Sequence, residues 1–525
     1  MDAGHTVLLL EAGGSDHSPF IKLPAAVWRL RPQHDWGYRA QPDPSRNGVV
    51  DDWHRGRVLG GTSSINGMIY VRGSAPDFDR WASLCGGVGG WSANEVLQVF
   101  RELEHSDQVG PMRGRHGLLH VRTVKRPHPV TEAFVESAHV SGHLFNADYN
   151  GATQEGTGYL QYTQFRGLRW SAADAFVKPI RRRRNFGLRL GALVERVELS
   201  NGRATAVIFR HKGTICREAG REITLCAGAI NTPKLLMLSG IGDPAELDQH
   251  KISVITELPA VGRNLKEHPC IGMSFRTKVP TYNLTQGFIQ RLGIVAKYLL
   301  HREGPIANAY EATVFLRLTR PVGAPELQVY FAPIGWARKD GVSRLTSFPA
   351  VKLFIARSHT ESSGRIKLAS ADPAEPPTIE SHVLEKDADL EMLVRGIQAV
   401  RAMMGARPVA ELLEAEIEPG RSVATAHALR DYIRRDSSLC CHALGTCRMG
   451  LGTDSVVGPD LRVHGTENLW IADASIMPDA ISANLNAVCM MIGAKLGKQF
   501  VERSLRAHVA RGSRAACQSK VAANE

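Results

Sequence analysis

The sequence lacks an uninterrupted apolar run of the roughly 18 residues that a helix needs to cross a bilayer, so no transmembrane segment is expected. Its first residues, MDAGHTVLLLEAGG, contain a short apolar run, but no basic region precedes it and Glu11 ends it. This pattern argues against a secretory signal and favours a buried strand. The nine cysteines are odd in number and include no CxxC pair, which argues against a disulfide framework and a metal site. Such cysteine usage is typical of a cytoplasmic protein.

Neither sign of charge dominates the chain. The 64 Lys and Arg residues against 52 Asp and Glu give a net charge of +12, and the basic residues are scattered except at 181–184 and 503–520. We therefore expect no nucleic-acid partner. The two basic clusters are typical of solvated surface; the alternative is peripheral membrane contact through anionic lipid, or an acidic electron-transfer partner. Residues 506–525 are predicted to form a disordered basic tail.

The stretch from Arg55 to Gly73, RGRVLGGTSSINGMIYVRG, combines a glycine pair, small hydroxyl residues and an apolar tail. Glycine has no Cβ, so the backbone at the pair can approach a planar ring closely. The following hydroxyl and amide groups can donate hydrogen bonds to a ring that gains negative charge on reduction. A glycine turn before a buried strand remains the alternative. The candidate wall of a flavin site is Gly60, Gly61, Thr62, Ser63, Asn66 and Gly67.

The apolar run Thr6 to Leu10 is predicted to be a parallel strand, with Glu11 at its end as the candidate acid for a ribose. In dinucleotide-binding folds this acid follows the GxGxxG fingerprint by about 20 residues. Only ten residues precede Glu11, so we expect the first strand, the GxGxxG turn and most of the first helix to be missing. A solvent-exposed acid at a strand end is the other interpretation.

The remaining pattern predicts a mixed α/β chain with two large interleaved domains. Residues 110–167 are interpreted as surface loops, and Ile223 to Gly242 as a strand, a turn and a helix with Pro233 at its first position. The other predicted elements are helices at 93–104 capped by Ser92, 171–177 and 388–404, a hairpin from 185 turning at Asn201-Gly202, and strands at 326–331, 351–355 and 365–368.

Two segments, GRVLGGTSSINGMIYVRG and GAINTPKLLMLSGIG, resemble the signatures of the glucose-methanol-choline (GMC) oxidoreductase family. The likeness continues in VLLLEAGG, LPAVGRNLKEHP, HALGTCRMG, VVGPDLRVHGTENLWIADASIMP and NLNAVCMMIGAKLG. Within the family the chain looks most similar to choline-dehydrogenase-like alcohol dehydrogenases. The resemblance implies a Rossmann-like FAD-binding domain formed by residues 1–150, 185–269 and 441–505. It also implies a substrate domain, 151–184 and 270–440, whose antiparallel sheet covers the flavin.

Oxidation of an alcohol needs a base beside an electron sink, and imidazole titrates near neutrality. By resemblance His442 in HALGTCRMG is the base. Asn486 corresponds to a second histidine or asparagine that donates to the substrate oxygen, although it is also suited to cap a helix beginning at Ala487. Asp473 and Ala474 would lie near the ribityl and pyrophosphate groups, and Val194 near the adenine. Ile65 replaces a histidine that bonds flavin in some relatives, so we expect non-covalent FAD.

The chain departs from the family pattern at Ala443, Glu267 and Cys489. The predicted function is FAD-dependent oxidation of a primary alcohol to the aldehyde, with electrons passed to an unidentified quinone, cytochrome or O₂. The alternatives are an oxidase using O₂, a lyase on the same fold, and an inactive flavin-free remnant. The missing fingerprint suggests the hypothesis that Met1 is an internal methionine and that the native product begins some tens of residues earlier.

Overall fold

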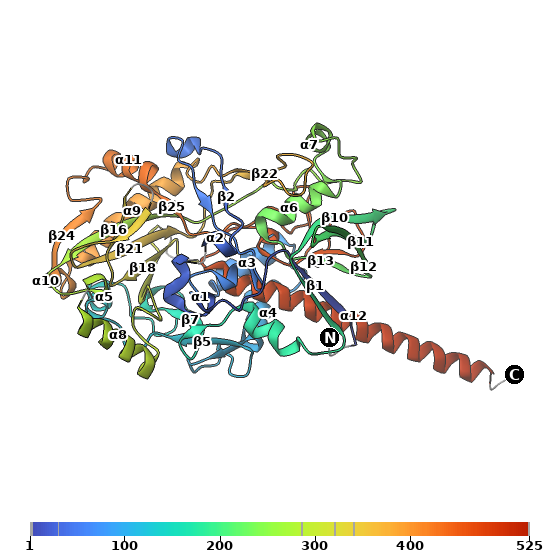
Figure 1. Ribbon diagram of the computed structural model, residues 1–525, viewed down its shortest axis with the longest axis horizontal. Helices are drawn as coiled ribbons and strands as arrows, with labels where there is room; N and C mark the ends of the chain where they lie inside the picture. Colours follow the sequence, from blue (N-terminus) through green and yellow to red (C-terminus); the bar gives the residue numbers. More distant parts are fainter. Residues whose placement is uncertain (1–3, 30, 285–286, 320–321, 340–341, 523–525) are drawn as a thin grey trace.

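The computed structural model describes residues 4–29, 31–284, 287–319, 322–339 and 342–522 of the chain (Figure 1). One half of the molecule carries short parallel strands, a three-stranded hairpin sheet and helix α6, and the other half carries a seven-stranded sheet with helices against it. Each half has its own apolar core. None of the described helices is long and apolar enough to cross a membrane.

The first apolar run forms β1 (Val7–Glu11), which pairs in parallel with β9 (Phe186–Leu190). A second parallel pair joins β13 (Ile223–Leu225) to β26 (Leu469–Ile471). Within the described residues no strand pairs with both β1 and β13. These two ladders are therefore separate from each other.

The predicted hairpin consists of β10 (Ala192–Ser200) and β11 (Arg203–His211), and β12 (Thr214–Ala219) extends it. Asn201 and Gly202 have φ of 50° and 75°. Positive φ at both positions matches the twist of the strands, and Asn-Gly tolerates it at little cost.

Helix α6 (Gly228–Leu238) begins five residues before Pro233, so the prediction that Pro233 opens the helix is wrong. A remote carboxylate caps the helix, because Asp473 Oδ2 accepts hydrogen bonds from Gly228 N (2.8 Å) and Thr232 Oγ1 (2.6 Å). Proline inside a helix leaves the carbonyl four residues earlier without its donor. Thr446 supplies that donor, since its hydroxyl lies 2.7 Å from Ala229 O.

The second half is built on an antiparallel sheet of seven strands with β25 paired beside β16. The strands are β24 (Leu413–Glu418), β16 (Pro269–Thr277), β21 (Ala350–Arg357), β18 (Leu327–Ala332), β17 (Ala312–Leu316), β6 (Gly156–Tyr159) and β25 (Ser438–Leu439). Helix α9 (Asp387–Gly405) packs on it, as its apolar periodicity predicts. The predicted strand at 365–368 is β22 (Arg365–Lys367), which pairs instead with β23 (Thr378–Glu380) in a separate ladder.

Residues 110–167, predicted to be loops, contain three strands and one helix. They are β5 (Leu119–Thr123), α5 (Pro129–Val140), β6 and β7 (Gln161–Phe165). The strands are rich in glycine and polar residues, and partners from distant segments stabilise them, as when β6 pairs with β17. This dependence on tertiary pairing conceals them in the sequence.

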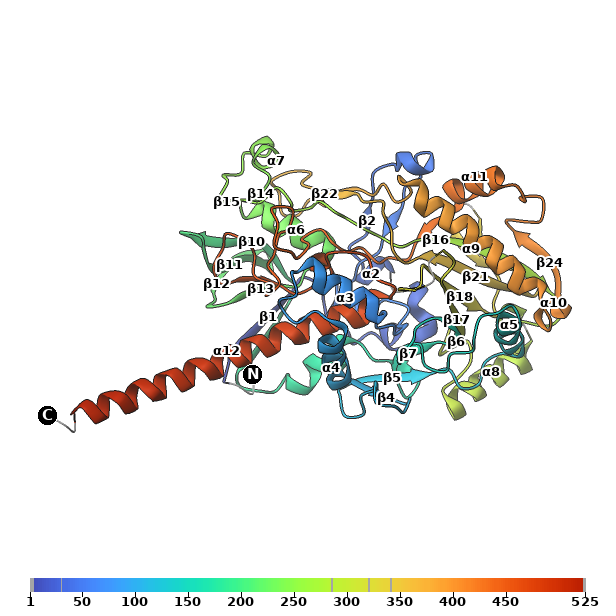
Figure 2. The same cartoon turned by 180° about the vertical axis from the view of Figure 1, so that it is seen from behind.

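Helix α12 (Leu485–Ala522) begins in the interior, contacts α4 (Ala93–Leu103) and then projects beyond the body of the molecule (Figure 1, Figure 2). Residues 506–522, predicted to be disordered, continue this helix because alanine, arginine, lysine and glutamine favour helix. Residues 523–525 lie outside the described part. Since α12 begins at Leu485, Asn486 lies in its first turn and does not cap a helix beginning at Ala487.

The remaining described helices and strands follow in chain order. They are α1 (Pro19–Lys22), η1 (Pro24–Arg29), α2 (Arg31–His34), β2 (Tyr38–Arg39), η2 (Pro44–Arg46), β3 (Asp52–Trp53), η3 (Gly61–Ser64), α3 (Ala75–Leu84), β4 (Glu104–Ser106), β8 (Leu168–Arg169), η4 (Ala173–Val177), η5 (Lys178–Ile180), β14 (Ile241–Gly242), α7 (Pro244–Gln249), β15 (Thr256–Glu257), η6 (Tyr282–Leu284), α8 (Phe288–His301), β19 (Trp336–Lys339), β20 (Val342–Leu345), α10 (Val409–Leu412), α11 (Ala426–Asp436) and η7 (Ala474–Ile476).

Candidate active site

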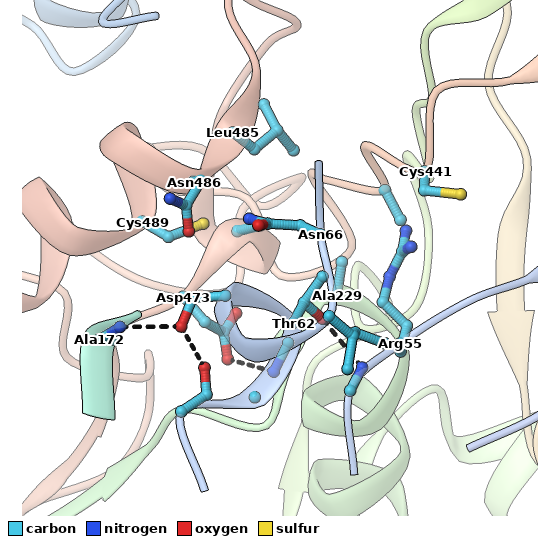
Figure 3. Close-up of a pocket in the computed structure, with 18 of the residues that line it drawn as sticks. Arg55, Thr62, Asn66, Ala172, Ala229, Cys441, Asp473, Leu485, Asn486 and Cys489 are labelled. Atoms are coloured by element: carbon cyan, nitrogen blue, oxygen red, sulfur yellow. Dashed lines mark hydrogen bonds between the residues drawn. The ribbon is translucent and has the colours of Figure 1, made fainter. Parts of the chain in front are cut away.

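A cavity of about 3070 Å³ runs from the parallel strands to the seven-stranded sheet. Its walls include β1, the segment before and through η3, the start of α6, the start of α12 and residues 437–443. Figure 3 shows side chains from these segments around one part of it. All the candidate residues of the sequence analysis line this cavity: Glu11, Gly60, Gly61, Thr62, Ser63, Asn66, Gly67, Val194, His442, Asp473, Ala474 and Asn486.

The glycine pair forms a tight turn in the cavity wall. Gly60 and Gly61 have φ of 90° and 55°, values that side chains other than glycine rarely adopt. A Cβ on Gly60 would lie 2.5 Å from Ser64 Oγ, whereas a Cβ on Gly61 or Gly67 would meet no atom within 4 Å. The backbone at Gly61 and Gly67 therefore leaves open space, which suits a closely packed ring.

The hydroxyl groups of Thr62 and Ser63 were expected to donate hydrogen bonds to a ring. They bond to the protein itself instead. Thr62 Oγ1 accepts from Gly56 N at 3.1 Å. Ser63 Oγ donates to Gly60 O at 2.6 Å and accepts from Ala172 N at 2.9 Å (Figure 3). Asn66 Oδ1 accepts from Met68 N and Arg169 Nη1. These bonds hold the turn in shape and leave the Asn66 amide N–H groups for a ligand.

Glu11 stands at the end of β1, where its Oε1 accepts a hydrogen bond from Gly13 N at 2.7 Å. Burial raises the pKa of its carboxyl to about 7, against the lowering effects of the Gly13 N–H and Arg57. Gly13 packs directly on the Arg57 backbone, since a Cβ there would lie 2.1 Å from Arg57 C. This contact fixes the candidate ribose acid beside the segment that leads to the glycine turn.

Asp473, Ala474 and Val194, which the family resemblance placed near the rest of the cofactor, all line the cavity. The Asp473 carboxylate is fully engaged by the protein: besides its two bonds to α6, its Oδ1 accepts from Ser475 N at 2.8 Å. Ala474 is buried beside it, and Val194 pairs with Phe209 within the hairpin sheet. Asp473 thus positions the start of α6, which faces the cavity.

The Glu267 side chain holds the segment that carries His442 in place through hydrogen bonds. Its Oε1 accepts from His268 N (2.9 Å) and His442 N (2.5 Å), and Arg55 Nη2 lies 3.7 Å from its Oε2. Burial raises the pKa of Glu267 to about 7, although Arg55 and the two N–H groups oppose the shift.

The two contacts of the His442 ring define its tautomer. Nδ1 lies 3.0 Å from His268 Nδ1, and Nε2 lies 3.3 Å from Asn484 Nδ2. With the Asn484 amide oriented as it is here, its Nδ2 donates to Nε2, and this orientation assigns the ring proton to Nδ1, which donates it to His268. Burial, His268 and Arg55 together hold the pKa of His442 well below 6.5. The ring is neutral near pH 7, and its Nε2 carries no proton.

Two amide atoms near this ring are buried without a hydrogen-bond partner among the described residues, Asn486 Nδ2 and Asn484 Oδ1. Buried amide groups are nearly always paired in folded proteins. Both residues line the cavity, so a bound molecule can satisfy them. Together with the open glycine wall, these atoms fit a flavin and a substrate. Ile65, also in the wall, offers no atom that could bond covalently to the flavin.

Sequence reasoning did not assign His268, Asn484 or Tyr330, which complete the surroundings of His442. Asn484 Nδ2 also donates to the Tyr330 hydroxyl at 3.1 Å, and that hydroxyl donates to Gln328. His268 reaches His442 because β16 pairs with β25. This pairing joins residues more than 160 positions apart and leaves no local signal.

A cavity with a glycine wall at one end and a neutral histidine held beside unpaired amides at the other suits a flavin-dependent oxidoreductase. Residues 13–270 and 360–493 match the N-terminal and C-terminal models of the GMC oxidoreductases. The chain belongs to the GMC oxidoreductase family. It is therefore an FAD-dependent alcohol oxidoreductase, and the predicted mixed fold, with an FAD-binding and a substrate domain, is confirmed.

Curated relatives and solved structures agree with this assignment. The chain is 37% identical over 518 residues to an oxygen-dependent choline dehydrogenase of Sinorhizobium fredii, covering 96% of this chain and 93% of that one. A Brucella ovis protein of the same name is 36% identical, with 96% and 92% covered. The structure of pyridoxine 4-oxidase from Mesorbium loti superposes with a TM-score of 0.86 at 27% identity, covering 95% of both chains. A formate oxidase variant of Aspergillus oryzae shares the fold, with a TM-score of 0.88 at 23% identity and 97% and 95% covered.

Proposed function

We propose that the protein oxidises a primary alcohol to the aldehyde, with His442 as the base and non-covalently bound FAD as the hydride acceptor. The observation that carries this proposal is the neutral His442 ring, whose Nε2 lone pair faces an amide in the cavity wall. The FAD-binding domain would comprise residues 1–150, 185–269 and 441–505, and the substrate domain residues 151–184 and 270–440.

His442 removes the hydroxyl proton of the alcohol at Nε2. The substrate hydroxyl replaces Asn484 as the donor to this atom, and the proton then rests on an imidazolium ring. His268 accepts from the opposite nitrogen and keeps the ring in the basic tautomer throughout. When bound, FAD would accept the hydride that leaves the carbon bearing this hydroxyl group.

The unpaired Asn486 Nδ2 donates to the substrate oxygen as its negative charge develops. The aromatic side chains of Tyr310, Trp336 and Phe354, whose ring centroids lie 6.0–6.3 Å apart, line the cavity on the side of the seven-stranded sheet. They provide an apolar surface for the body of the alcohol and exclude water from the reacting atoms.

The residues that line the cavity indicate which of them would hold FAD. Gly60, Gly61 and Gly67 would hold the flavin ring, and Glu11 would accept hydrogen bonds from the ribose hydroxyls; all four residues line the cavity. Val194 lies on the adenine side, and Asp473 with Ala474 orders the α6 terminus near the ribityl chain and pyrophosphate.

The electron acceptor is an unidentified quinone, cytochrome or O₂. The Sinorhizobium fredii and Brucella ovis relatives are named oxygen-dependent, and the similar Mesorbium loti structure is an oxidase, which supports O₂. A cytoplasmic protein with peripheral membrane contact is part of the same proposal, on the basis of its cysteine usage and basic clusters.

Anaerobic titration of the FAD-loaded protein with a panel of alcohols tests the proposal. Choline, benzyl alcohol and short aliphatic alcohols are the primary members, and secondary alcohols of matched size are the controls. We expect at least one primary alcohol to bleach the flavin bands in proportion to aldehyde formed, and peroxide to appear if O₂ then restores them. An FAD-loaded protein that no primary alcohol reduces would overturn the proposal.

A further inference from the structure

Two thiol groups meet in the wall of the cavity, close to the base. Cys270 lies in β16 and Cys440 directly follows β25, and both line the cavity. Each thiol lies close enough to the other to change its ionisation. Cys270 Sγ also lies 3.3 Å from Ser438 Oγ.

The pairing of two strands creates this contact. Cys270 is opposite Ser438 in the antiparallel ladder, and Cys440 N donates to His268 O at 3.1 Å. Side chains two residues apart share one face of a strand, so Cys270 and Cys440 project to the same side as diagonal neighbours. Cys440 lies beyond the last residue of β25, where the backbone can adjust.

We propose that Cys270 and Cys440 form a redox site in which a hydroperoxide, hydrogen peroxide in the simplest case, oxidises the two thiols to a disulfide. In the first step the Cys270 thiolate attacks the peroxide; the O–O bond breaks, the sulfur becomes a sulfenic acid, and one molecule of water or alcohol leaves. In the second step the Cys440 sulfur displaces the sulfenic hydroxyl as water. Two thiols thus lose two electrons and one peroxide bond gains them.

The environment of each sulfur supports this order of events. The neighbouring Cys440 and Ser438 side chains lower the pKa of the Cys270 thiol, despite burial. The pKa of Cys440 is raised well above 9, by Cys270 and by burial. Since the thiolate is the attacking species, Cys270 attacks and Cys440 resolves.

The disulfide would act on catalysis through the chain segment that carries His442. Joining the sulfurs brings them to about 2 Å. Cys440 must then move toward β16, and His442 lies only two residues further along, held by Glu267 and His268. A shift of this segment misplaces the His442 ring, so oxidation slows the reduction of the flavin by substrate.

The experiment exposes the FAD-loaded protein to hydrogen peroxide, blocks the remaining thiols by alkylation and maps cross-linked peptides by mass spectrometry. We expect a Cys270–Cys440 cross-link and at least a tenfold loss in the rate of flavin reduction, both reversed by a thiol reductant. Cys270→Ser and Cys440→Ser should each retain their own untreated rate after peroxide. Cys216→Ser, which removes a thiol from β12 outside the cavity, is the matched control and should remain as sensitive as the parent.

The peptide map of the parent protein tests whether the cross-link forms, even if a serine variant fails to fold. A cross-link that uses Cys441 in place of either cysteine, or peroxide-treated protein in which both thiols remain free or only over-oxidised, would overturn the proposal. So would an equal loss of rate in the Cys440→Ser variant, because the loss would then arise elsewhere.

Discussion

Among single residues, Glu267 holds the backbone at both histidines of the site. One of its carboxylate oxygens accepts the backbone N–H groups of both His268 and His442. The residue is buried, and its pKa is raised to about 7. A carboxyl that resists ionisation makes the stability of the protein depend on pH.

Glu267→Gln should change that pH dependence in a defined direction. The folded pKa of about 7 exceeds the ordinary pKa of 4.5, so the stability from the protonated carboxyl is complete below pH 4.5 and is lost as pH rises through 7. The glutamine amide of the variant does not ionise, so the variant loses no stability over this pH range. The variant should therefore gain stability relative to the parent between pH 4.5 and 7, by on the order of 3 kcal/mol.

Denaturant unfolding at several pH values measures this difference. The exposed Glu257→Gln is the control and should show no comparable trend. A difference between parent and Glu267→Gln that is constant from pH 4.5 to 7 would show that burial does not raise the pKa of Glu267.

The two asparagines near the base should be separable by mutation. Asn486→Ala removes a donor to the substrate oxygen and should slow flavin reduction by about 10²-fold or less. Asn484→Ala removes the amide that contacts Nε2, so it should chiefly alter the pH profile of the same step. If Asn486→Ala changes only the FAD content, Asn486 is part of the scaffold and not of the reaction.

Some of these residues could be predicted from the sequence and others could not. His442 and Asn486 lie in recognisable segments, and the structure places both in the cavity wall. Asn484 was overlooked although it is only two residues from Asn486. Its importance depends on its distance to His442 Nε2, which no sequence spacing encodes. The roles of Thr62 and Ser63 differ from expectation because their hydroxyls find partners within the turn.

At the scale of elements, the site depends on loops pressed tightly against one another. Gly13 lies on the Arg57 backbone, and the neighbouring Gly14 forms an isolated bridge with Val58. This contact joins the end of β1 to the segment that leads into the glycine turn. Only glycine allows such an approach, since a Cβ at position 13 would overlap the backbone.

Gly13→Ala and Gly14→Ala form a matched pair that tests this contact. A Cβ at Gly13 would lie 2.1 Å from Arg57 C, while at Gly14 it would meet nothing within 4 Å. Both changes restrict the unfolded chain equally. We expect Gly13→Ala to lower the free energy of unfolding by about 3 kcal/mol and Gly14→Ala to change it by less than about 1 kcal/mol. Equal effects would contradict the close packing.

Element prediction succeeded where local pattern and tertiary context agree. The β10–β11 hairpin has alternating apolar residues and an Asn-Gly turn, and α9 has clear helical periodicity. Prediction failed for the strands and helix within 110–167, which distant partners stabilise, and for the start of α6, which a distant aspartate caps. The helix at 506–522 was not predicted because a dense basic cluster is typical of a solvated tail, although alanine, arginine and lysine also favour helix.

At the scale of the whole molecule, the cavity connects the two halves and FAD would bridge them. Ile65 in its wall cannot form a covalent bond to the flavin. Acid precipitation of the FAD-loaded protein should therefore release all of the flavin into the supernatant. Flavin that remains in the protein pellet after washing would contradict non-covalent binding.

FAD should also stabilise the fold by mass action. A ligand at 100 times its dissociation constant contributes about 2.7 kcal/mol if it binds only the folded state. Protein stripped of flavin should unfold at a lower temperature, and added FAD should restore the value in a concentration-dependent way. Riboflavin, which lacks the adenine and pyrophosphate, is the control and should restore less.

The most direct test of the proposed mechanism is the rate of flavin reduction in His442→Ala. Parent and variant, both loaded with FAD, are mixed anaerobically with a reducing alcohol, and the bleaching of the flavin is followed by stopped flow. Loss of the base should slow this step by about 10²- to 10⁴-fold while the flavin content stays the same. Equal rates in the two proteins would contradict the assignment of His442 as the base.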